Sequence, residues 1–276
     1  MKKAIIITFS VVLTLGLILS LTGLIMYGFN FNDIRADIQQ TRHFQAVKHE
    51  NIQNTFSNVR IDVAQHNVNI RQSSDEYFHL DYYYHREYAT VTESIEGEQL
   101  HLRMRERFRF QLFQVSSTSK YSVNLHIPVG FDGNVVIYVT SGNVNVQNIN
   151  VEDLTINLTS GNVFINNLNT DTVNVNVSSG NTTMNNTIAK SISVVATSGN
   201  TILYRVDSGY IRTVTTSGNN RVTVLGSEHE FRIELNTRSG RSTVGGQRRS
   251  GISNNNAPNR VTMQATSGNN TLNFVT

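Results

Sequence analysis

The stretch Val139-Thr-Ser-Gly-Asn-Val-Asn-Val decides the fold, because its Ser-Gly pair recurs at six further glycines that are spaced almost regularly along the chain. The first four intervals between the repeated glycines are 19 residues long, and the last two are 22 and 28. A nearly fixed period of this length is typical of a repeat protein, in which one supersecondary unit stacks on copies of itself. The repeated glycines are Gly142, Gly161, Gly180, Gly199, Gly218, Gly240 and Gly268.

Apolar residues recur at fixed distances from these glycines and alternate with Asn, Thr and Ser, the period of a half-buried strand. We therefore predict an all-β fold in which residues 131–276 form a β-solenoid of about seven coils. Each coil has two short strands joined at a Ser-Gly-Asn corner, and coils are expected to stack in chain order. The column seven residues before each glycine contains Val135, Leu154, Val173, Ile192, Ile211, Ile233 and Val261.

The glycine and the asparagine of the Ser-Gly-Asn corner have different roles. Glycine adopts positive φ without a steric penalty, which a sharp corner needs. Asn follows the glycine in every repeat except one, where Arg241 stands. These asparagines are interpreted either as turn formers or as stacked amides that bond to one another along the solenoid.

Residues 1–30 are predicted to be a transmembrane signal-anchor. The segment 4–26 carries no charged residue and is long enough for a helix to span about 30 Å of hydrocarbon. Lys2 and Lys3 precede it, so the positive-inside rule places the N-terminus in the cytoplasm and the remainder outside. The alternative is a cleaved signal peptide. We expect a single-pass protein of the cell membrane with most of its chain extracytoplasmic.

Two further segments separate this anchor from the solenoid. Residues 31–55 are polar and are interpreted as a stalk. Residues 56–130 contain several alternating apolar runs, which predict antiparallel strands with one buried face. This β head is expected to cap the first coil, because an exposed solenoid end is an unpaired strand edge.

Several motifs resemble one known family. The run from His126-Ile-Pro-Val-Gly to the first Ser-Gly-Asn corner, with Val59-Arg-Ile-Asp-Val and Asn67-Val-Asn-Ile, is similar to the domain-of-unknown-function 4097 family of adhesin-like β-strand repeats. The resemblance covers residues 55–276. It implies a bacterial envelope protein, often membrane-anchored and in some members associated with envelope stress, and it supplies no catalytic residues. The family commonly has Asp as well as Asn after the repeat glycine, whereas this chain has almost only Asn, which disfavours a cation-binding ladder.

Carboxylates are sparse in the repeats, and we expect neither an enzyme nor a cofactor. Residues 133–276 contain seven acidic residues, of which only Glu152 and Asp171 come close to sharing a column. Carboxylate catalysis needs two acids held a few ångströms apart. The chain has no cysteine, which excludes disulfides and thiol chemistry. A metal site is conceivable on one strand face, although a solvated polar face explains the same residues better: His79, Asp81, His85 and Glu87.

Alternating arginines are the first candidate binding residues. They share one side of a predicted strand: Arg103, Arg105, Arg107 and Arg109. Like charges in a row need anions nearby. One source is cross-strand pairing with glutamates of the head, which are Glu87, Glu93, Glu96 and Glu98. The other source is an external anionic wall polymer or phospholipid.

A second basic group contains Arg248 and Arg249, in a Gly- and Asn-rich insertion from Gly245 to Pro258 that is expected to form a flexible loop. The extracytoplasmic location disfavours nucleic acid as the partner. The sequence therefore predicts a non-enzymatic binding or scaffold protein of a bacterial envelope. The alternative is an envelope-stress sensor, which would need a membrane protein partner because only Met1, Lys2 and Lys3 are expected in the cytoplasm.

Overall fold

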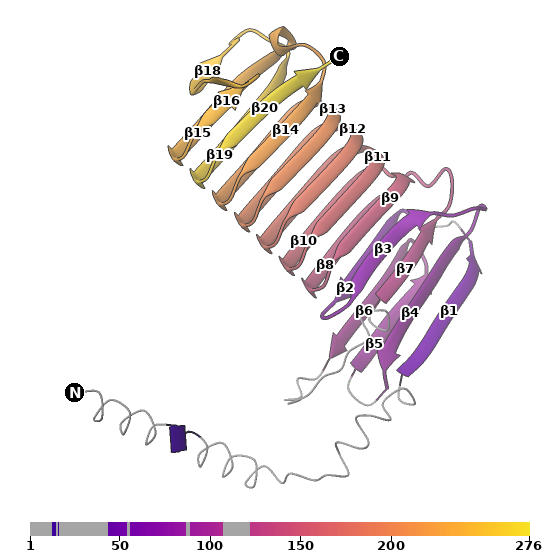
Figure 1. The fold of residues 1–276 in the computed structure, drawn as a ribbon. Helices are drawn as coiled ribbons and strands as arrows, with labels where there is room; N and C mark the ends of the chain where they lie inside the picture. Colours follow the sequence, from indigo (N-terminus) through magenta and orange to yellow (C-terminus); the bar gives the residue numbers. More distant parts are fainter. Residues whose placement is uncertain (1–12, 15, 17–43, 54–55, 87–88, 107–121) are drawn as a thin grey trace. The chain divides into compact units, whose positions relative to one another are not determined.

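The computed structural model of the chain describes residues 13, 14, 16, 44–53, 56–86, 89–106 and 122–276. Residues 45–276 form one compact unit, and residues 1–44 belong to another. The larger unit is all-β and solenoid-like, with strand after strand paired along a stack (Figure 1). All but residues 13, 14 and 16 of the predicted anchor, and most of the predicted stalk, fall outside the described residues. Within the described part, no helix is long and apolar enough to cross a membrane.

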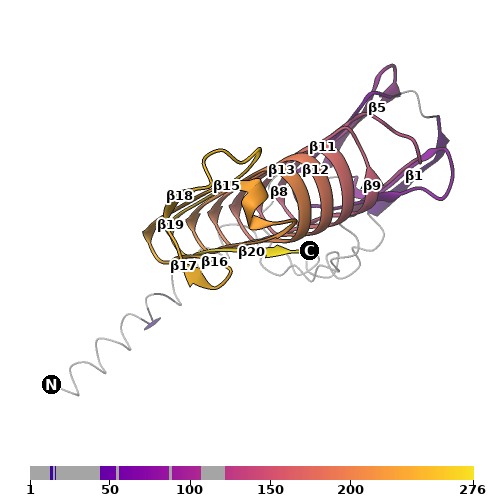
Figure 2. The ribbon, with the colours of Figure 1, turned by 90° about the horizontal axis from the view of Figure 1, so that it is seen from above.

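The coils of the stack have two strand faces around a shared core (Figure 2). The first face contains β8 and β10 with the second halves of the long strands, and the second face contains β9 and β14 with their first halves. The strands of this central part are β8 (Asn134–Ser141), β9 (Val144–Asn150), β10 (Asp153–Ser160), β11 (Val163–Ser179), β12 (Thr182–Ser198), β13 (Thr201–Ser217) and β14 (Asn220–Leu225).

The predicted register is confirmed through this central part. Leu154 lies opposite Val173 in the β10–β11 ladder, and Val173 lies opposite Ile192 in the β11–β12 ladder. All these ladders are parallel, so each column of side chains repeats from coil to coil. The apolar columns are fully buried and form one core along the stack. Burial of every second residue explains the alternation in the sequence.

The glycine corners need glycine for two reasons. Gly180 has a φ of 142°, which residues other than glycine rarely adopt. A Cβ on Gly180 would also lie 1.6 Å from the carbonyl oxygen of Gly161 in the neighbouring coil. The corner backbones of successive coils are therefore too close for any side chain.

The corner asparagines form the amide ladder that was one of the two interpretations. The Asn143 side-chain oxygen accepts hydrogen bonds from the backbone nitrogen of Asn162 at 2.9 Å and from its Nδ2 at 3.3 Å. The same pattern continues along the stack. A second ladder follows the opposite corner, where the column residues have φ between 49° and 54°: Asn148, Asn167, Asn186 and Arg205. Asn tolerates this left-handed conformation better than most residues.

The N-terminal end corrects the prediction of an antiparallel head. β2 (Asn58–Val63) and β3 (Asn67–Gln72) pair in parallel with β8 and β9. β6 (Gln99–Glu106) and β7 (Ser122–Ile127) pair in parallel with β2 and β3 on their other side. The ladders therefore run across residue 131, where the solenoid was expected to begin. Parallel pairing lets Ile61 and Val68 join the same buried core.

Three other strands cover this end of the stack. β4 (Phe78–His85) is antiparallel to β7, and β5 (Ala89–Glu96) is antiparallel to β6, as expected for a cap. β1 (Phe44–Ile52) pairs with β4, although its sequence belongs to the predicted stalk. Three aromatic rings pack edge to face beneath these strands, and they belong to Phe56, Phe78 and Phe131.

The C-terminal end departs from chain order. The last coil, β19 (Asn259–Ser267) and β20 (Asn270–Val275), lies between β13–β14 and the coil formed by β15 (Phe231–Ser239) and β16 (Ser242–Val244). The expected stacking in chain order is therefore wrong here. The terminal coil is covered by the short antiparallel strands β17 (Gln247–Arg248) and β18 (Gly251–Ser253), in place of the expected flexible loop.

Candidate functional site

The alternating arginines have a counter-charge that was not predicted. Arg103 lies opposite Asp62 in the parallel β2–β6 ladder, and its Nε is 3.7 Å from an Asp62 carboxylate oxygen. Arg105 is exposed. Arg107 and Arg109 lie outside the described residues, so the structure describes half of this row. Asp62 was missed because strand direction, and therefore its neighbour, could not be read from the sequence.

Glu93 does not face the arginines, contrary to the prediction. It accepts a hydrogen bond from the Tyr82 hydroxyl, and Nε2 of His49 lies 2.8 Å from its other oxygen. Burial, together with this bond to a carboxylate, raises the pKa of Tyr82. The cluster therefore links β1, β4 and β5 and has a structural role. Of the other expected partners, Glu87 and the side chain of Glu96 lie outside the described residues, and Glu98 accepts bonds from Ser57 and Asn58 through its backbone oxygen.

The second basic group belongs to the terminal coil. Arg249 forms an ion pair with Glu228, while Arg248 is exposed on β17. Arg238 and Arg241, on either side of the Gly240 corner, are exposed too. We call these four residues the terminal-coil arginines. Residues 201–276 contain nine arginines but only four acidic residues, so this end of the stack has a basic excess.

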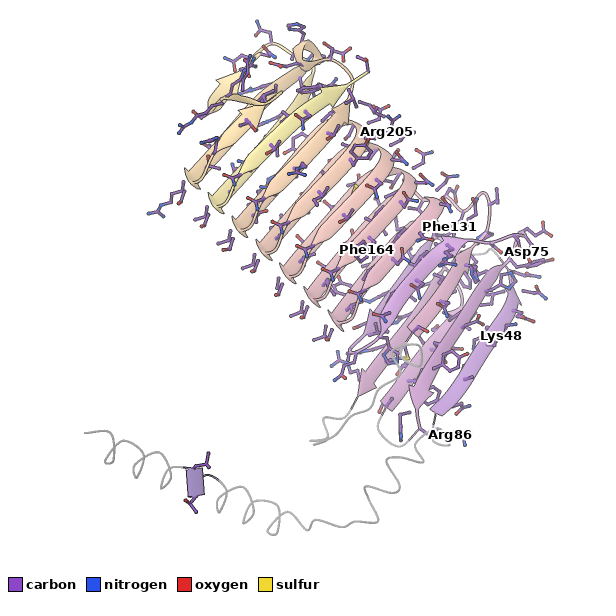
Figure 3. The ribbon with its side chains drawn as sticks, in the orientation of Figure 1. Lys48, Asp75, Arg86, Phe131, Phe164 and Arg205 are labelled. Atoms are coloured by element: carbon purple, nitrogen blue, oxygen red, sulfur yellow. The ribbon has the colours of Figure 1, made fainter. Side chains whose placement is uncertain are left out.

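The two arginine groups do not form one site. β6 lies near one end of the strand order, whereas β16 and β17 lie at the other end, with the whole central part of the stack between them. Arg205, on a corner between these ends, is exposed as well (Figure 3). Any ligand that contacts both groups must therefore be a long polymer or a surface.

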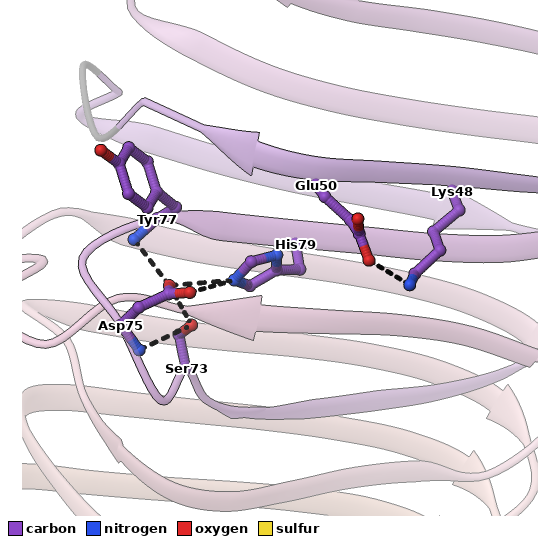
Figure 4. Close-up of polar contacts among 6 residues, drawn as sticks. All are labelled: Lys48, Glu50, Ser73, Asp75, Tyr77 and His79. Atoms are coloured by element: carbon purple, nitrogen blue, oxygen red, sulfur yellow. Dashed lines mark hydrogen bonds and ion pairs between the residues drawn. The ribbon is translucent and has the colours of Figure 1, made fainter.

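Of the polar face considered for metal binding, His79 is held by a hydrogen bond to Asp75, which lies outside that face. Asp75 accepts bonds from the Tyr77 backbone at 3.0 Å, from Ser73 at 2.8 Å and from His79 Nε2 at 2.9 Å (Figure 4). These bonds lower the pKa of Asp75. His85 is buried, unlike His79. Across the described ranges, no three His, Asp or Glu side chains are grouped as metal ligands.

Two open grooves cross the outer surface of the stack. One, of about 390 Å³, lies on the first face beside Asp62, Tyr138 and Asn157. The guanidinium of Arg60 stacks 4.6 Å from the Tyr138 ring centre on this face. The other groove, of about 860 Å³, lies on the second face and includes Phe164. Sequence reasoning missed both, because their residues belong to the polar half of the alternation.

These features agree with the family comparison, in which a family model described as Toastrack DUF4097 matches residues 56–273. The chain belongs to the Toastrack DUF4097 family. The match spans both the predicted head and the predicted solenoid, and the family resemblance inferred from the sequence is confirmed. No curated protein matches the chain.

Solved structures of low sequence identity are also similar to this Toastrack protein. A "putative adhesin" from Parabacteroides merdae is 16% identical, with 84% of this chain and 96% of that chain covered and a TM-score of 0.40. One from Bacteroides fragilis is 12% identical, with 86% and 99% covered and a TM-score of 0.40. A "putative lipid binding protein" from Parabacteroides distasonis is 12% identical, with 85% and 97% covered and a TM-score of 0.42.

Proposed function

We propose that this protein is a non-enzymatic binding protein of a bacterial cell envelope. Residues 1–30 anchor it in the membrane by a single pass, and the stack is displayed on the outer side. The terminal-coil arginines hold an anionic wall polymer or phospholipid head groups. The observation that carries the proposal is the excess of nine arginines over four acids in residues 201–276, with all four terminal-coil arginines exposed.

Only two of the nine arginines in residues 201–276 form ion pairs with acids of this region in the structure, so most of the positive charge is available to a ligand. Glu228 pairs with Arg249, and Glu234 pairs with Arg260 at 2.8 Å. A carboxylate oxygen of Glu230 accepts the backbone N–H of Ser227. Each basic residue near an anionic surface contributes about 1 kcal/mol. Several together give useful binding, which salt weakens because the Debye length is about 8 Å at physiological ionic strength.

The test is co-sedimentation of the compact unit, residues 45–276, with anionic phospholipid vesicles and with purified wall teichoic acid. Replacement of Arg238, Arg241 and Arg248 by Gln should reduce binding at least tenfold, and raised salt should do the same to the parent protein. Lys190→Gln is the matched control, because Lys190 is exposed in the central part and pairs with Asp171. Equal binding by the triple variant and this control would contradict the proposal.

A second variant examines the other arginine row. Arg103, Arg105, Arg107 and Arg109 are replaced together by Gln. The proposal expects a smaller loss here, because Asp62 already lies beside Arg103. A larger loss than for the terminal-coil variant would move the anion site to the N-terminal end of the stack.

A further inference from the structure

The larger groove on the second face, which we call the amide groove, is lined mainly by amide and hydroxyl side chains from β3, β7, β9, β11 and β12. None of the described residues that line it is charged. This neutrality contrasts with the basic excess at the C-terminal end of the same stack. The amides that matter here are Asn69, Asn145, Gln147, Asn166 and Asn185.

Parallel register arranges the groove residues in two rows that cross the strands. The first row contains Asn145, Phe164 and Thr183. The second row contains Gln147, Asn166 and Asn185. Neighbouring strands are about 4.8 Å apart, so each row presents one outward side chain per strand at this interval. One sugar unit of an extended β-1,4-linked glycan has a similar length, so successive units of such a chain meet successive strands.

Phe164 breaks the polar pattern of its row. It points outward from β11 with 45% of its surface exposed, midway along the stack (Figure 3). The core therefore does not account for it. Its ring offers an apolar face beside amides, which suits the apolar face of a sugar ring. Exposed Ile202 and Tyr204 continue the two rows on β13.

The amides retain hydrogen-bonding capacity. Nε2 of Gln147 donates to the Asn145 side-chain oxygen at 3.0 Å, and Nδ2 of Asn69 donates to Asn124 at 2.9 Å. An amide has two donor hydrogens and an acceptor oxygen with two lone pairs, so one such bond leaves further donors and acceptors. Sugar hydroxyls both donate and accept hydrogen bonds, and so do amides. A carboxylate can only accept and an ammonium group can only donate, so an amide is the better match.

We propose that the amide groove binds a neutral polysaccharide that runs along the stack and crosses the strands. One sugar ring stacks on Phe164, and hydroxyls of neighbouring units bond to Asn166 and Asn185. The residues that line the groove offer an anionic polymer no counter-charge, and arginines enter the two rows only beyond the lining, where Arg71 lies opposite Gln147 and Arg221 lies opposite Ile202. An acyl chain would remove the amides from water without pairing them, which is costly. The site differs from the terminal-coil arginines in both place and ligand chemistry.

The experiment is isothermal titration of the full-length chain, in detergent, with neutral hexasaccharides: β-1,4-glucan, β-1,3-glucan, α-mannan and β-1,4-linked N-acetylglucosamine. At least one should bind, with an affinity that changes less than twofold between low and physiological salt. Phe164→Ala and the double variant Asn166→Ala/Asn185→Ala should each weaken binding at least tenfold. These side chains are exposed or half-buried, so the fold should persist, as circular dichroism would show.

Ile188→Ala is the matched control, because Ile188 is equally apolar, 56% exposed and outside the groove on β12. It should bind like the parent. The proposal is overturned if none of the four glycans binds, or if Phe164→Ala binds as tightly as the control. It is also overturned if binding is lost with the terminal-coil arginines or with salt. Either of those last two outcomes would show that the glycan does not bind in the neutral amide groove. The anion proposal is judged separately, with anionic vesicles and teichoic acid, so the two failures are distinguishable.

Discussion

The side-chain amide of Asn220 donates a hydrogen bond to the side-chain oxygen of Asn270, 2.9 Å away, and both side chains are fully buried. In earlier coils the same interior column contains Val144 and Val163, followed by Thr182 and Thr201. A buried amide is costly unless it is paired. The pair therefore favours the observed order, in which the last coil lies directly against β14. If the coil of β15 and β16 lay against β14 in its place, Asn220 would face Ser242.

Breaking this pair should destabilise the protein by about 1–3 kcal/mol, the usual cost of a buried polar group left without its partner. Asn270→Val removes one of the two acceptors of the Asn220 amide, the other being the Gln264 carbonyl oxygen. Asn220→Val removes the acceptor of Thr215, whose hydroxyl donates to Asn220 at 2.6 Å. The double variant should lose less than the sum of the two. Urea unfolding of all four proteins measures this coupling. Strict additivity would show that the pair does not act as a unit.

A left-handed backbone conformation costs a non-glycine residue about 1–2 kcal/mol. Gly180→Ala should lower the free energy of unfolding by more than this. The added Cβ would meet a backbone oxygen at 1.6 Å, which no side-chain movement relieves. Gly245→Ala isolates the backbone strain, because Gly245 has a φ of 55° and open space around it. Gly209→Ala tests space alone, because Gly209 has no positive φ and an added Cβ would meet the Asn259 side-chain oxygen at 3.3 Å and the Lys190 carbonyl oxygen at 3.8 Å.

Thermal unfolding of these three variants should rank Gly180→Ala as the least stable and Gly209→Ala as the closest to the parent. If Gly180→Ala and Gly245→Ala lose similar stability, close backbone approach is not what requires glycine at the corner.

The central coils could be predicted from the sequence because each carries its own signal. A Ser-Gly corner and a fixed interval place Leu154 opposite Val173 without any knowledge of other elements. The earlier coil of β2 and β3 lacks this signal, since His66 stands where the other coils have glycine. It shares the corner asparagine with the other coils, because the side-chain oxygen of Asn67 accepts the backbone N–H of Asn143 at 2.8 Å. A search for the Asn ladder alone would have found this coil.

The ends and the grooves depend on information that is not local. The insertion of the last coil rests on partners 50 residues apart, such as Asn220 and Asn270. The partner of Arg103 depends on strand direction, because only parallel pairing brings Asp62 beside it. Phe164 is one outward residue among many in the sequence. Its place in a groove follows from the shape of the assembled face.

The membrane anchor is a prediction that protease treatment can check. If residues 1–30 form an uncleaved anchor oriented by Lys2 and Lys3, protease added to wall-free cells should digest the stack. The protein should also stay with membranes after a high-salt wash. As a control, protease added outside inverted membrane vesicles should leave the stack intact, because the stack then faces the vesicle lumen. A mature N-terminus between residues 21 and 24 would instead show that the segment is a cleaved signal peptide.

Folding stability should fall as the pH drops below about 6.5 because of His66. This residue is fully buried at the first corner, with Nε2 3.0 Å from the carbonyl oxygen of Tyr83. Burial lowers its pKa from the ordinary value of 6.5, and the bond to Tyr83 only partly opposes this. Above pH 6.5 His66 is neutral in both states, and its contribution is complete. Below it the unfolded chain takes up a proton before the folded one does, so stability is lost.

The slope from His66 reaches at most about 1.4 kcal/mol per pH unit between pH 6.5 and its lower folded pKa, and it flattens below that value. His101 and His126 also have lowered pKa values through burial, so they add to the same window. His66→Gln isolates the contribution of His66, because Gln does not titrate. Urea unfolding of parent and variant from about pH 8 to pH 5 should show a shallower decline for the variant. Parallel curves would show that His66 does not couple protonation to folding.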